Sequence, residues 1–125
     1  MRADYGRIAG RILVVEDNAA VRRSVVRQIE SFGYKVESAA SAGEALYILR
    51  SDQDFDMVFS DVVMPGEMDG VDLARIVQRD YPGMRVVLTS GYPDYEEANH
   101  NCEFLPKPYR RDALRALLSR CLNPA

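Results

Sequence analysis

Charged and hydroxyl side chains follow the short apolar runs of this 125-residue chain, at the points where the runs end. Such runs predict buried parallel strands, and the carboxyl ends of parallel strands lie along one edge of a sheet. We therefore expect three carboxylates, one hydroxyl and one ammonium group to converge at a single edge. The residues concerned are Glu16, Asp17, Asp61, Thr89 and Lys107.

The three carboxylates predict a metal site. At close range Glu16, Asp17 and Asp61 would repel one another strongly unless a cation lay among them. A hard divalent ion prefers oxygen ligands, and Mg²⁺ keeps several waters while binding one or two protein carboxylates. We therefore expect these residues to hold Mg²⁺, or Mn²⁺ in its place.

The hydroxyl and the ammonium group predict what this site acts on. Lys107 carries a compact cation suited to an anionic oxygen, and Thr89 adds a hydroxyl donor. Together with a metal and a free carboxylate they suit a phosphoryl group, whose transfer depends on positioning and on neutralising charge. Asp61 is the expected nucleophile, forming an aspartyl phosphate. A cis bond between Lys107 and Pro108 would aim the lysine back across the sheet edge.

Alternating strands and helices are expected to position these residues. The expected strands cover residues 11–16, 34–39, 55–60, 85–89 and 102–105. Helices are expected from Asn18 to Gly33, from Ser41 to about Arg50, around residues 71–77, and around residues 114–121. This alternation predicts an α/β fold in which a parallel sheet has helices on both faces, because its crossovers are right-handed.

The segment of residues 91–101 departs from this pattern. It stands where a fourth helix is expected, yet only Tyr92, Tyr95 and Ala98 could be buried. We therefore predict a short or poorly ordered fourth helix.

Composition indicates one domain and excludes several classes of partner. A net charge of −3 and a pI near 5.2 argue against direct contact with nucleic acid. The longest apolar runs fall far short of the roughly 18 residues that span a bilayer, so no membrane contact is expected. Residues 1–10 show no signal peptide and are interpreted as a tail or linker remnant, with the domain over residues 11–123.

The cysteines and the basic residues give little support for a further functional site. Cys102 and Cys121 are too few for a disulfide framework, which favours a reduced, cytoplasmic domain. His100 beside Cys102 offers two potential metal ligands without further partners, which is weak support for a site. The basic pairs at residues 22–23 and 110–111 are interpreted as solvated helix faces.

Five motifs resemble one known family. They are Val-Val-Glu-Asp-Asn at residues 14–18, Asp-Val-Val-Met-Pro at 61–65, Met-Asp-Gly at 68–70, Leu-Thr-Ser-Gly at 88–91 and Leu-Pro-Lys-Pro at 105–108. In this order they resemble the receiver domain of two-component response regulators, across about residues 11–122. The resemblance is greatest to the receiver domains of hybrid sensor histidine kinases, and it implies five parallel strands in the flavodoxin-like order 2-1-3-4-5.

The resemblance also implies a role for each site residue. Asp61 resembles the phosphoacceptor, which takes a phosphoryl group from a phosphohistidine on a histidine kinase or histidine phosphotransfer protein. Glu16 and Asp17 match the acidic pair that binds Mg²⁺. Asp17 and Asp61 would be direct ligands, Glu16 would act through water, and the backbone carbonyl of Val63 would complete the set.

The remaining matched positions concern the phosphoryl oxygens and a conformational switch. Thr89 and Lys107 match the hydroxyl and the lysine that contact the phosphoryl group. Phe104 stands where the family has its switch aromatic, whose inward movement is coupled to Thr89. This movement would alter a face that binds a downstream protein partner.

Two departures from the family pattern concern the surroundings of the site. The loop after Pro65 is one residue longer than the commonest form, and the stretch from Thr89 to Lys107 is shorter, within the fourth helix. The usual output face therefore cannot be assumed. Val63 also places an apolar side chain beside the site.

Three alternatives stay open at this point. One is a receiver-like module that works by binding without phosphorylation. Another is a small aspartyl-phosphate phosphatase, although phosphatases of the haloacid-dehalogenase type carry their nucleophile after the first strand. The third is a flavin-binding electron carrier, although the acidic pair in the first loop would repel the phosphate that such a loop binds.

Because no effector domain is visible after Leu122, we expect a stand-alone regulator or a receiver from a hybrid kinase. We do not expect a turnover enzyme in the usual sense.

Overall fold

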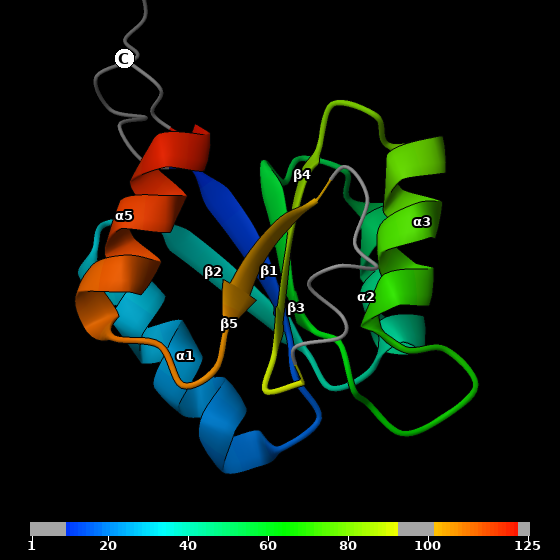
Figure 1. The fold of residues 1–125 in the computed structure, drawn as a ribbon. Helices are drawn as coiled ribbons and strands as arrows, with labels where there is room; N and C mark the ends of the chain where they lie inside the picture. Colours follow the sequence, from blue (N-terminus) through cyan, green and yellow to red (C-terminus); the bar gives the residue numbers. More distant parts are fainter. Residues whose placement is uncertain (1–9, 93–101, 123–125) are drawn as a thin grey trace, which may run out of the picture.

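A parallel sheet of five strands forms the middle layer of the molecule (Figure 1). The computed structural model describes residues 10–92 and 102–122. The strand order is β2-β1-β3-β4-β5, as predicted. The strands are β1 (Arg11–Val15), β2 (Lys35–Ala39), β3 (Met57–Asp61), β4 (Arg85–Ser90) and β5 (Glu103–Pro106).

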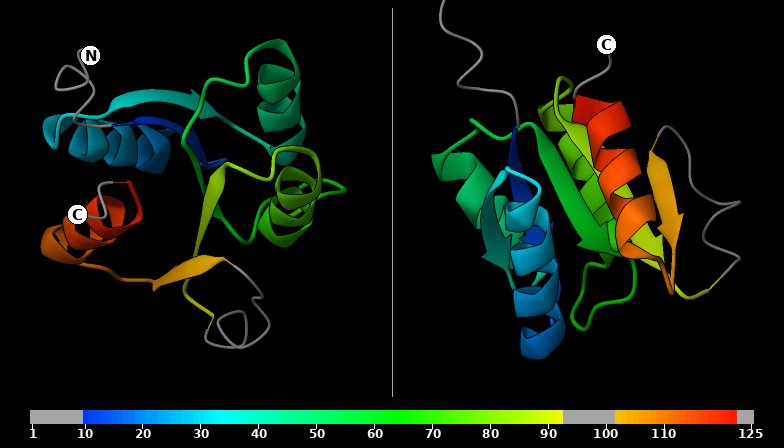
Figure 2. Two further views of the ribbon diagram at one scale, coloured as in Figure 1. Left: turned by 90° about the horizontal axis from the view of Figure 1, so that it is seen from above. Right: turned by 90° about the vertical axis from the view of Figure 1, so that its left-hand side faces the viewer.

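Helices cover both faces of the sheet (Figure 2). The helices α1 (Ala19–Ser31) and α5 (Arg111–Leu122) pack on one face, and α2 (Ala42–Ser51) and α3 (Gly70–Asp80) pack on the other. Alternate residues of each strand serve the two layers: in β1, Leu13 belongs to the core under α2 and α3, whereas Ile12 belongs to the core under α1 and α5. The prediction of an α/β sheet covered on both sides is confirmed.

Side-chain caps explain where the helices begin. Asn18 Oδ1 accepts from the backbone N–H of Val21, and Ser41 Oγ accepts from that of Glu44. A further capping box joins Asp69 and Asp72 at the start of α3, where each side chain accepts from the other residue's backbone N–H. The sequence analysis missed this box, although the Asp-x-x-Asp spacing before an apolar run was its signal.

Several boundaries differ from the prediction by one residue. Strand β1 ends at Val15, so Glu16 lies just beyond it, and β5 runs one residue further along the chain than predicted. The Lys107–Pro108 bond is cis. Cys102 and Cys121 are not joined in a disulfide, and they lie on opposite faces of the sheet.

Two predictions concern parts of the chain that the structure leaves out. The short fourth helix falls mostly on residues 93–101, outside the described residues, so it stays a prediction. The same holds for the tail at residues 1–10, of which only Gly10 is described. The backbone carbonyl of Gly10 accepts from the N–H of Lys35 at the start of β2.

Candidate functional site

The acidic cluster predicted from the sequence forms at the carboxyl edge of the sheet, the lower edge in Figure 1. The sheet order reverses between β1 and β3, and at such a point the loops after the two strands open a crevice. Glu16 and Asp17 follow β1, and Asp61 ends β3 beside it. Glu16, Asp17 and Asp61 each offer a carboxylate oxygen, and these oxygens lie within 4.8 Å of one another.

Lys107 reaches this cluster from the loop after β5. Its Nζ donates to Asp61 Oδ1 at 3.1 Å and lies 3.9 Å from Glu16 Oε1. The backbone N–H of Lys107 donates to the carbonyl of Ser90, which fixes the start of the loop against the end of β4. The lysine therefore contacts the acid that was predicted to be the nucleophile.

Backbone and side-chain bonds hold the first acidic loop in place. The N–H of Glu16 donates to the carbonyl of Ala39, and the N–H of Asn18 donates to Glu16 Oε2 at 2.9 Å. Arg22 Nη1 donates to the backbone carbonyl of Glu16 at 2.8 Å. The loop after β1 is thus tied to both β2 and α1, which orients Glu16 toward the cluster.

Burial makes the ionised forms of Asp61 and Glu16 unfavourable. It raises the pKa of Asp61, and the hydrogen bond and charge of Lys107 oppose this effect only in part. Burial also raises the pKa of Glu16, and the charge of Asp61 adds to the rise, while the N–H of Asn18 opposes it. One ammonium group against three carboxylates leaves negative charge uncompensated, so the all-oxygen donor set fits Mg²⁺ or Mn²⁺.

Thr89 provides a second observation that fits an oxygen-bearing ligand at this site. It pairs with Asp61 in the register of β3 and β4, and it is only 3% exposed. Its Oγ1 is buried and finds no hydrogen-bond partner among the residues that the structure describes. Because a buried hydroxyl without a partner is costly, an oxygen-bearing group bound at Asp61 would satisfy it.

Gly70 brings α3 directly against the backbone of Asp61. A Cβ built on Gly70 would lie 2.2 Å from the carbonyl oxygen of Asp61 and 2.9 Å from Cα of Val62. The N–H of Gly70 donates to the carbonyl of Val62. Only glycine fits this approach, which gives the physical reason for the Met-Asp-Gly motif.

The other predicted residues lie around the cluster. The side chain of Val63, two residues after Asp61 in the chain, is exposed. Phe104 pairs with Leu88 in the register of β4 and β5, and its half-buried ring packs against the core under α2 and α3. Phe104 therefore sits one position before the β5 residue that pairs with Thr89.

Tyr109 is an aromatic residue near the site whose contacts the sequence analysis missed. Its ring meets that of Phe59 edge-on, with the centroids 6.4 Å apart. Burial, with the charges of Glu16 and Asp61, raises the pKa of Tyr109 to about 12. An aromatic residue directly after the Lys-Pro pair was the available signal.

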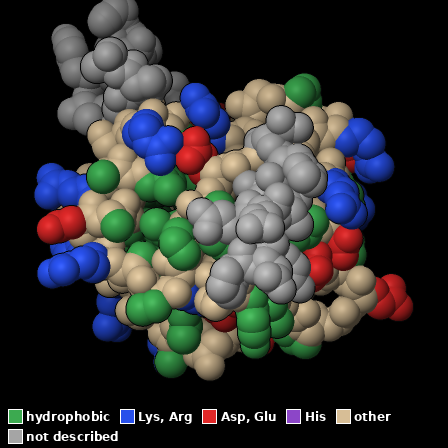
Figure 3. Space-filling model, viewed as in Figure 1, with side chains coloured by type: hydrophobic (Ala, Val, Ile, Leu, Met, Phe, Trp, Pro, Cys, Tyr) green, Lys and Arg blue, Asp and Glu red, His purple; other side chains and the backbone are tan. Residues whose placement is uncertain are grey.

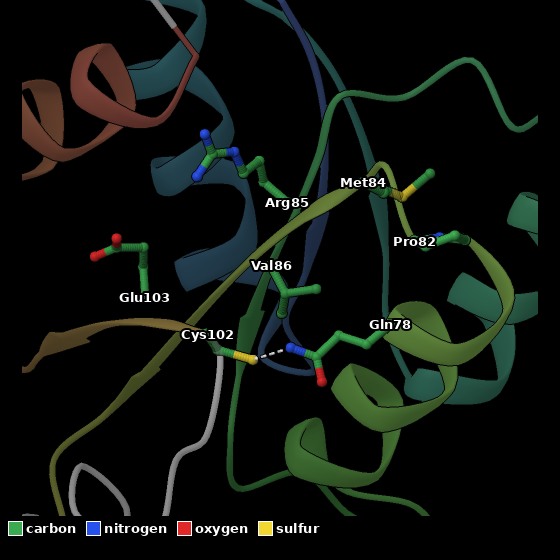
Figure 4. Close-up of a pocket in the computed structure, with 7 residues that line it drawn as sticks. All are labelled: Gln78, Pro82, Met84, Arg85, Val86, Cys102 and Glu103. Carbon is green, nitrogen blue, oxygen red and sulfur yellow. Dashed lines mark hydrogen bonds between the residues drawn. The ribbon is translucent and has the colours of Figure 1, made fainter. Parts of the chain in front are cut away.

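A larger hollow lies away from this chemistry. It measures about 540 Å³ and is lined by the end of α3 and the amino ends of β4 and β5, so it opens at the opposite edge from Asp61 (Figure 4). Gln78 Nε2 donates to Cys102 Sγ at 3.2 Å across this hollow. Burial raises the pKa of the Cys102 thiol, which disfavours the reactive thiolate. The acidic cluster therefore remains the candidate site.

Comparison with known proteins identifies related chains. Residues 12–119 match the family model of the response regulator receiver domain. The sensor kinase CckA of Brucella abortus is 39% identical over 118 residues, which cover 90% of this chain and 12% of the kinase. The response regulator receiver protein CpdR of the same organism is 34% identical over 108 residues, covering 79% of this chain and 85% of CpdR. This chain therefore spans only a small part of the first of these relatives.

Solved structures show the same fold. The receiver domain of the hybrid histidine kinase CckA is 36% identical, with a TM-score of 0.79, and covers 91% of this chain and 100% of that domain. The response regulator protein TrrA of Thermotoga maritima, solved in complex with Mg²⁺-BeF, is 26% identical, with a TM-score of 0.83. That match covers 90% of this chain and 98% of TrrA. No described helix of this chain has the length and apolar character needed to cross a bilayer.

Proposed function

This chain belongs to the receiver-domain family of two-component response regulators, the phosphoacceptor modules of phosphorelay signalling, and we propose that Asp61 accepts the phosphoryl group. The observation that carries this proposal is the convergence on Asp61. Lys107 Nζ lies 3.1 Å from its Oδ1, and two further carboxylates lie within 4.8 Å. The donor would be a phosphohistidine on a histidine kinase or histidine phosphotransfer protein.

The chemical step follows from the positions of these groups. A carboxylate oxygen of Asp61 attacks phosphorus, the P–N bond to the donor imidazole breaks, and its electron pair returns to the imidazole nitrogen. Lys107 and Thr89 then lie where an ammonium group and a hydroxyl can donate to the phosphoryl oxygens on Asp61. The hydroxyl of Thr89, which has no hydrogen-bond partner within residues 10–92 and 102–122, supports this role.

A divalent ion would complete the charge balance. Asp17 and Asp61 are the proposed direct ligands, with Glu16 acting through water and the backbone carbonyl of Val63 completing the protein ligands. When bound, Mg²⁺ or Mn²⁺ would neutralise the carboxylates and the phosphoryl oxygens. The donor set and the burial of the acids support this assignment.

Thr89 and Phe104 are the proposed switch. Leu105 pairs with Thr89 in the sheet, and Phe104 is its neighbour in the chain. A change in the position of the Thr89 hydroxyl would therefore reach the ring of Phe104 through one strand pair.

We place this module in the cytoplasm, either as a stand-alone regulator or as the receiver of a hybrid kinase.

Labelling by a small phosphodonor tests the acceptor. The wild-type chain, incubated with acetyl phosphate and Mg²⁺, should gain one phosphoryl group by intact-protein mass spectrometry. Asp61→Asn should abolish the gain, because an amide cannot form the acyl phosphate. Asp80→Asn, a surface carboxylate paired with Arg79, is the matched control and should label normally. Undiminished labelling of Asp61→Asn would refute the assignment.

The same preparation separates the alternatives. A phosphatase would hydrolyse phosphate esters over many turnovers, whereas a receiver domain would turn over only its own aspartyl phosphate. A module that works by binding alone would show no Mg²⁺-dependent labelling of the wild-type chain.

A further inference from the structure

Two aromatic rings join the loop after β5 to the strand that ends at Asp61. The ring of Tyr109 meets that of Phe59 edge-on, with an angle of 84° between the planes and 6.4 Å between the centroids. Phe59 lies on β3 two residues before Asp61, and Tyr109 lies two residues after Lys107. The two rings, which we name the aromatic pair, therefore join the segments that carry Asp61 and Lys107.

The aromatic pair has a rigid support. Phe59 is 2% exposed and belongs to the core under α1 and α5, together with Leu114 and Leu118, and Tyr109 packs against this core. Strand β3 is itself paired with β1 on one side and with β4 on the other. An edge-to-face contact is favourable beyond the apolar area that it buries. The contact therefore holds the chain at Tyr109 against the middle of the sheet.

A backbone hydrogen bond holds the chain on the other side of this contact. The N–H of Lys107 donates to the carbonyl of Ser90 at the end of β4, at 2.9 Å. The lysine thus lies between a hydrogen bond to β4 and a ring contact with β3. Without the ring of Tyr109, the loop would keep the hydrogen bond and lose the contact with β3.

The position of Lys107 determines how the charge of the site is balanced. Among the residues that the structure describes, Lys107 is the one cation that forms ion pairs with Asp61 and Glu16, at 3.1 and 3.9 Å. Figure 3 shows that other Lys and Arg side chains gather along the left-hand side, over α5 and α1. The side chain of Lys107 is 33% exposed, and fixing a lysine costs rotamer entropy. Its direction therefore depends on how firmly its backbone is held.

We propose that Tyr109 is a positioning residue whose ring, packed on Phe59, holds the ammonium group of Lys107 beside Asp61. This inference rests on the proposed function, because the lysine would donate to the phosphoryl oxygens on Asp61. The ring acts through packing and adds no charge, since burial and the charges of Glu16 and Asp61 raise the pKa of Tyr109 to about 12. A misplacement of about 1 Å can slow a reaction about 100-fold, so a small movement of the loop would matter.

Labelling kinetics test whether the ring acts through Lys107. Tyr109→Leu keeps an apolar side chain but removes the ring, and it should slow labelling by acetyl phosphate at saturating Mg²⁺ about tenfold. Tyr109→Phe should recover the rate, because the ring is restored. In a Lys107→Met background, Tyr109→Leu should change the rate by no more than about twofold, since no ammonium group remains to be positioned.

Tyr34 provides the matched control. It is 7% exposed in the same core layer as Phe59, and it stands before β2, outside the two segments that the aromatic pair joins. Tyr34→Leu should lower the free energy of unfolding in urea, as Tyr109→Leu should, and yet label at the wild-type rate. Equal losses of rate in the two variants would show a general loss of structure and would overturn the proposal. A full tenfold effect of Tyr109→Leu in the Lys107→Met background would overturn it as well.

Nuclear magnetic resonance observes the lysine itself. The chain has two lysines, Lys35 and Lys107, so selective ¹³C labelling of lysine gives two sets of signals. Without metal, the two Hε protons of Lys107 should give separate resonances, because the side chain is held against Asp61. Those of the exposed Lys35 should average to one resonance. Tyr109→Leu should merge the two resonances of Lys107, whereas Tyr34→Leu should leave them separate.

This second measurement distinguishes the inference from the proposed function. The resonances of Lys107 report its position whether or not Asp61 accepts a phosphoryl group. Failure of the wild type to label would refute the proposed function, and the resonances would still decide the role of Tyr109. Separate Hε resonances of Lys107 in Tyr109→Leu would overturn the positioning role.

Discussion

At the scale of single residues, this site holds more negative charge than its own cation can balance. Three carboxylates share one edge of the sheet, and Lys107 contacts Asp61 and lies near Glu16. Burial raises the pKa values of both Glu16 and Asp61, so ionising them works against the folded state. The proposed binding of a cation and of a phosphoryl group would offset this loss of stability.

Magnesium should therefore stabilise the fold. At a concentration one hundred times its Kd, a ligand that binds only the folded state contributes about 2.7 kcal/mol. For a domain of this size the thermal midpoint should rise by about 10 °C. Asp61→Asn should lower this rise, and without the metal it should be at least as stable as the wild type, because one buried repulsion is removed.

Differential scanning calorimetry measures both effects. Sodium chloride at equal ionic strength controls for screening, and a chelator should reverse the rise. An undiminished Mg²⁺-dependent rise in Asp61→Asn would contradict the ligand assignment.

At the scale of the elements, the site depends on how closely α3 approaches β3. The start of α3 is fixed by the capping box of Asp69 and Asp72, and Gly70 then lies against the carbonyl of Asp61. The helix thereby closes the loop after Asp61, the same loop that carries Val63.

Gly70→Ala should damage both stability and labelling. Its Cβ would lie 2.2 Å from the carbonyl oxygen of Asp61, a backbone atom that cannot move without displacing the proposed acceptor. We expect a loss of about 1–3 kcal/mol in urea unfolding, together with slower labelling by acetyl phosphate. Gly83→Ala is the matched control, because nothing lies within 4 Å of its added Cβ. Equal effects of the two substitutions would argue against the close approach.

At the scale of the whole molecule, the carboxyl and amino edges of the sheet differ in their residues and interactions. The carboxyl edge carries the site, and the amino edge is tied together by Arg11 at the start of β1. The guanidinium of Arg11 pairs with Glu37 on β2 and with Asp52 after α2, and it stacks over Phe55 at 4.1 Å. One side chain thus joins β1, β2 and the connection between α2 and β3.

Acid should weaken the ion pair between Arg11 and Asp52. The hydrogen bond from Arg11 lowers the pKa of Asp52, so the carboxylate binds its proton less readily in the folded state than in the unfolded one. The ionised Asp52 carboxylate therefore contributes to the free energy of unfolding. This contribution is fully present above the unfolded pKa, near 3.8, and it is lost as the pH falls through the lower pKa of the folded state.

The variant Arg11→Gln isolates this contribution. The difference in unfolding free energy between the wild type and Arg11→Gln should be constant above about pH 5 and shrink below about pH 4. Denaturant unfolding measured across this range checks the sign. A difference that grows on acidification would contradict the pairing.

The sequence by itself determined the strands, most helix starts and the residues of the candidate site. Short apolar runs followed by acids are local patterns, and so are Asn18 and Ser41 as caps. The motifs around Asp61 and Lys107 were equally visible. Such features depend on neighbours in the chain, which is why they could be predicted.

Only the tertiary structure decided how these residues meet. Lys107 reaches Asp61 across 46 positions of the chain, and the hydroxyl of Thr89 proves to be buried without a partner in the described structure. The close approach of Gly70 to the backbone of Asp61 was equally hidden. Strand register and helix packing set these distances, and both arise from burial summed over the whole core, which no single stretch of sequence encodes.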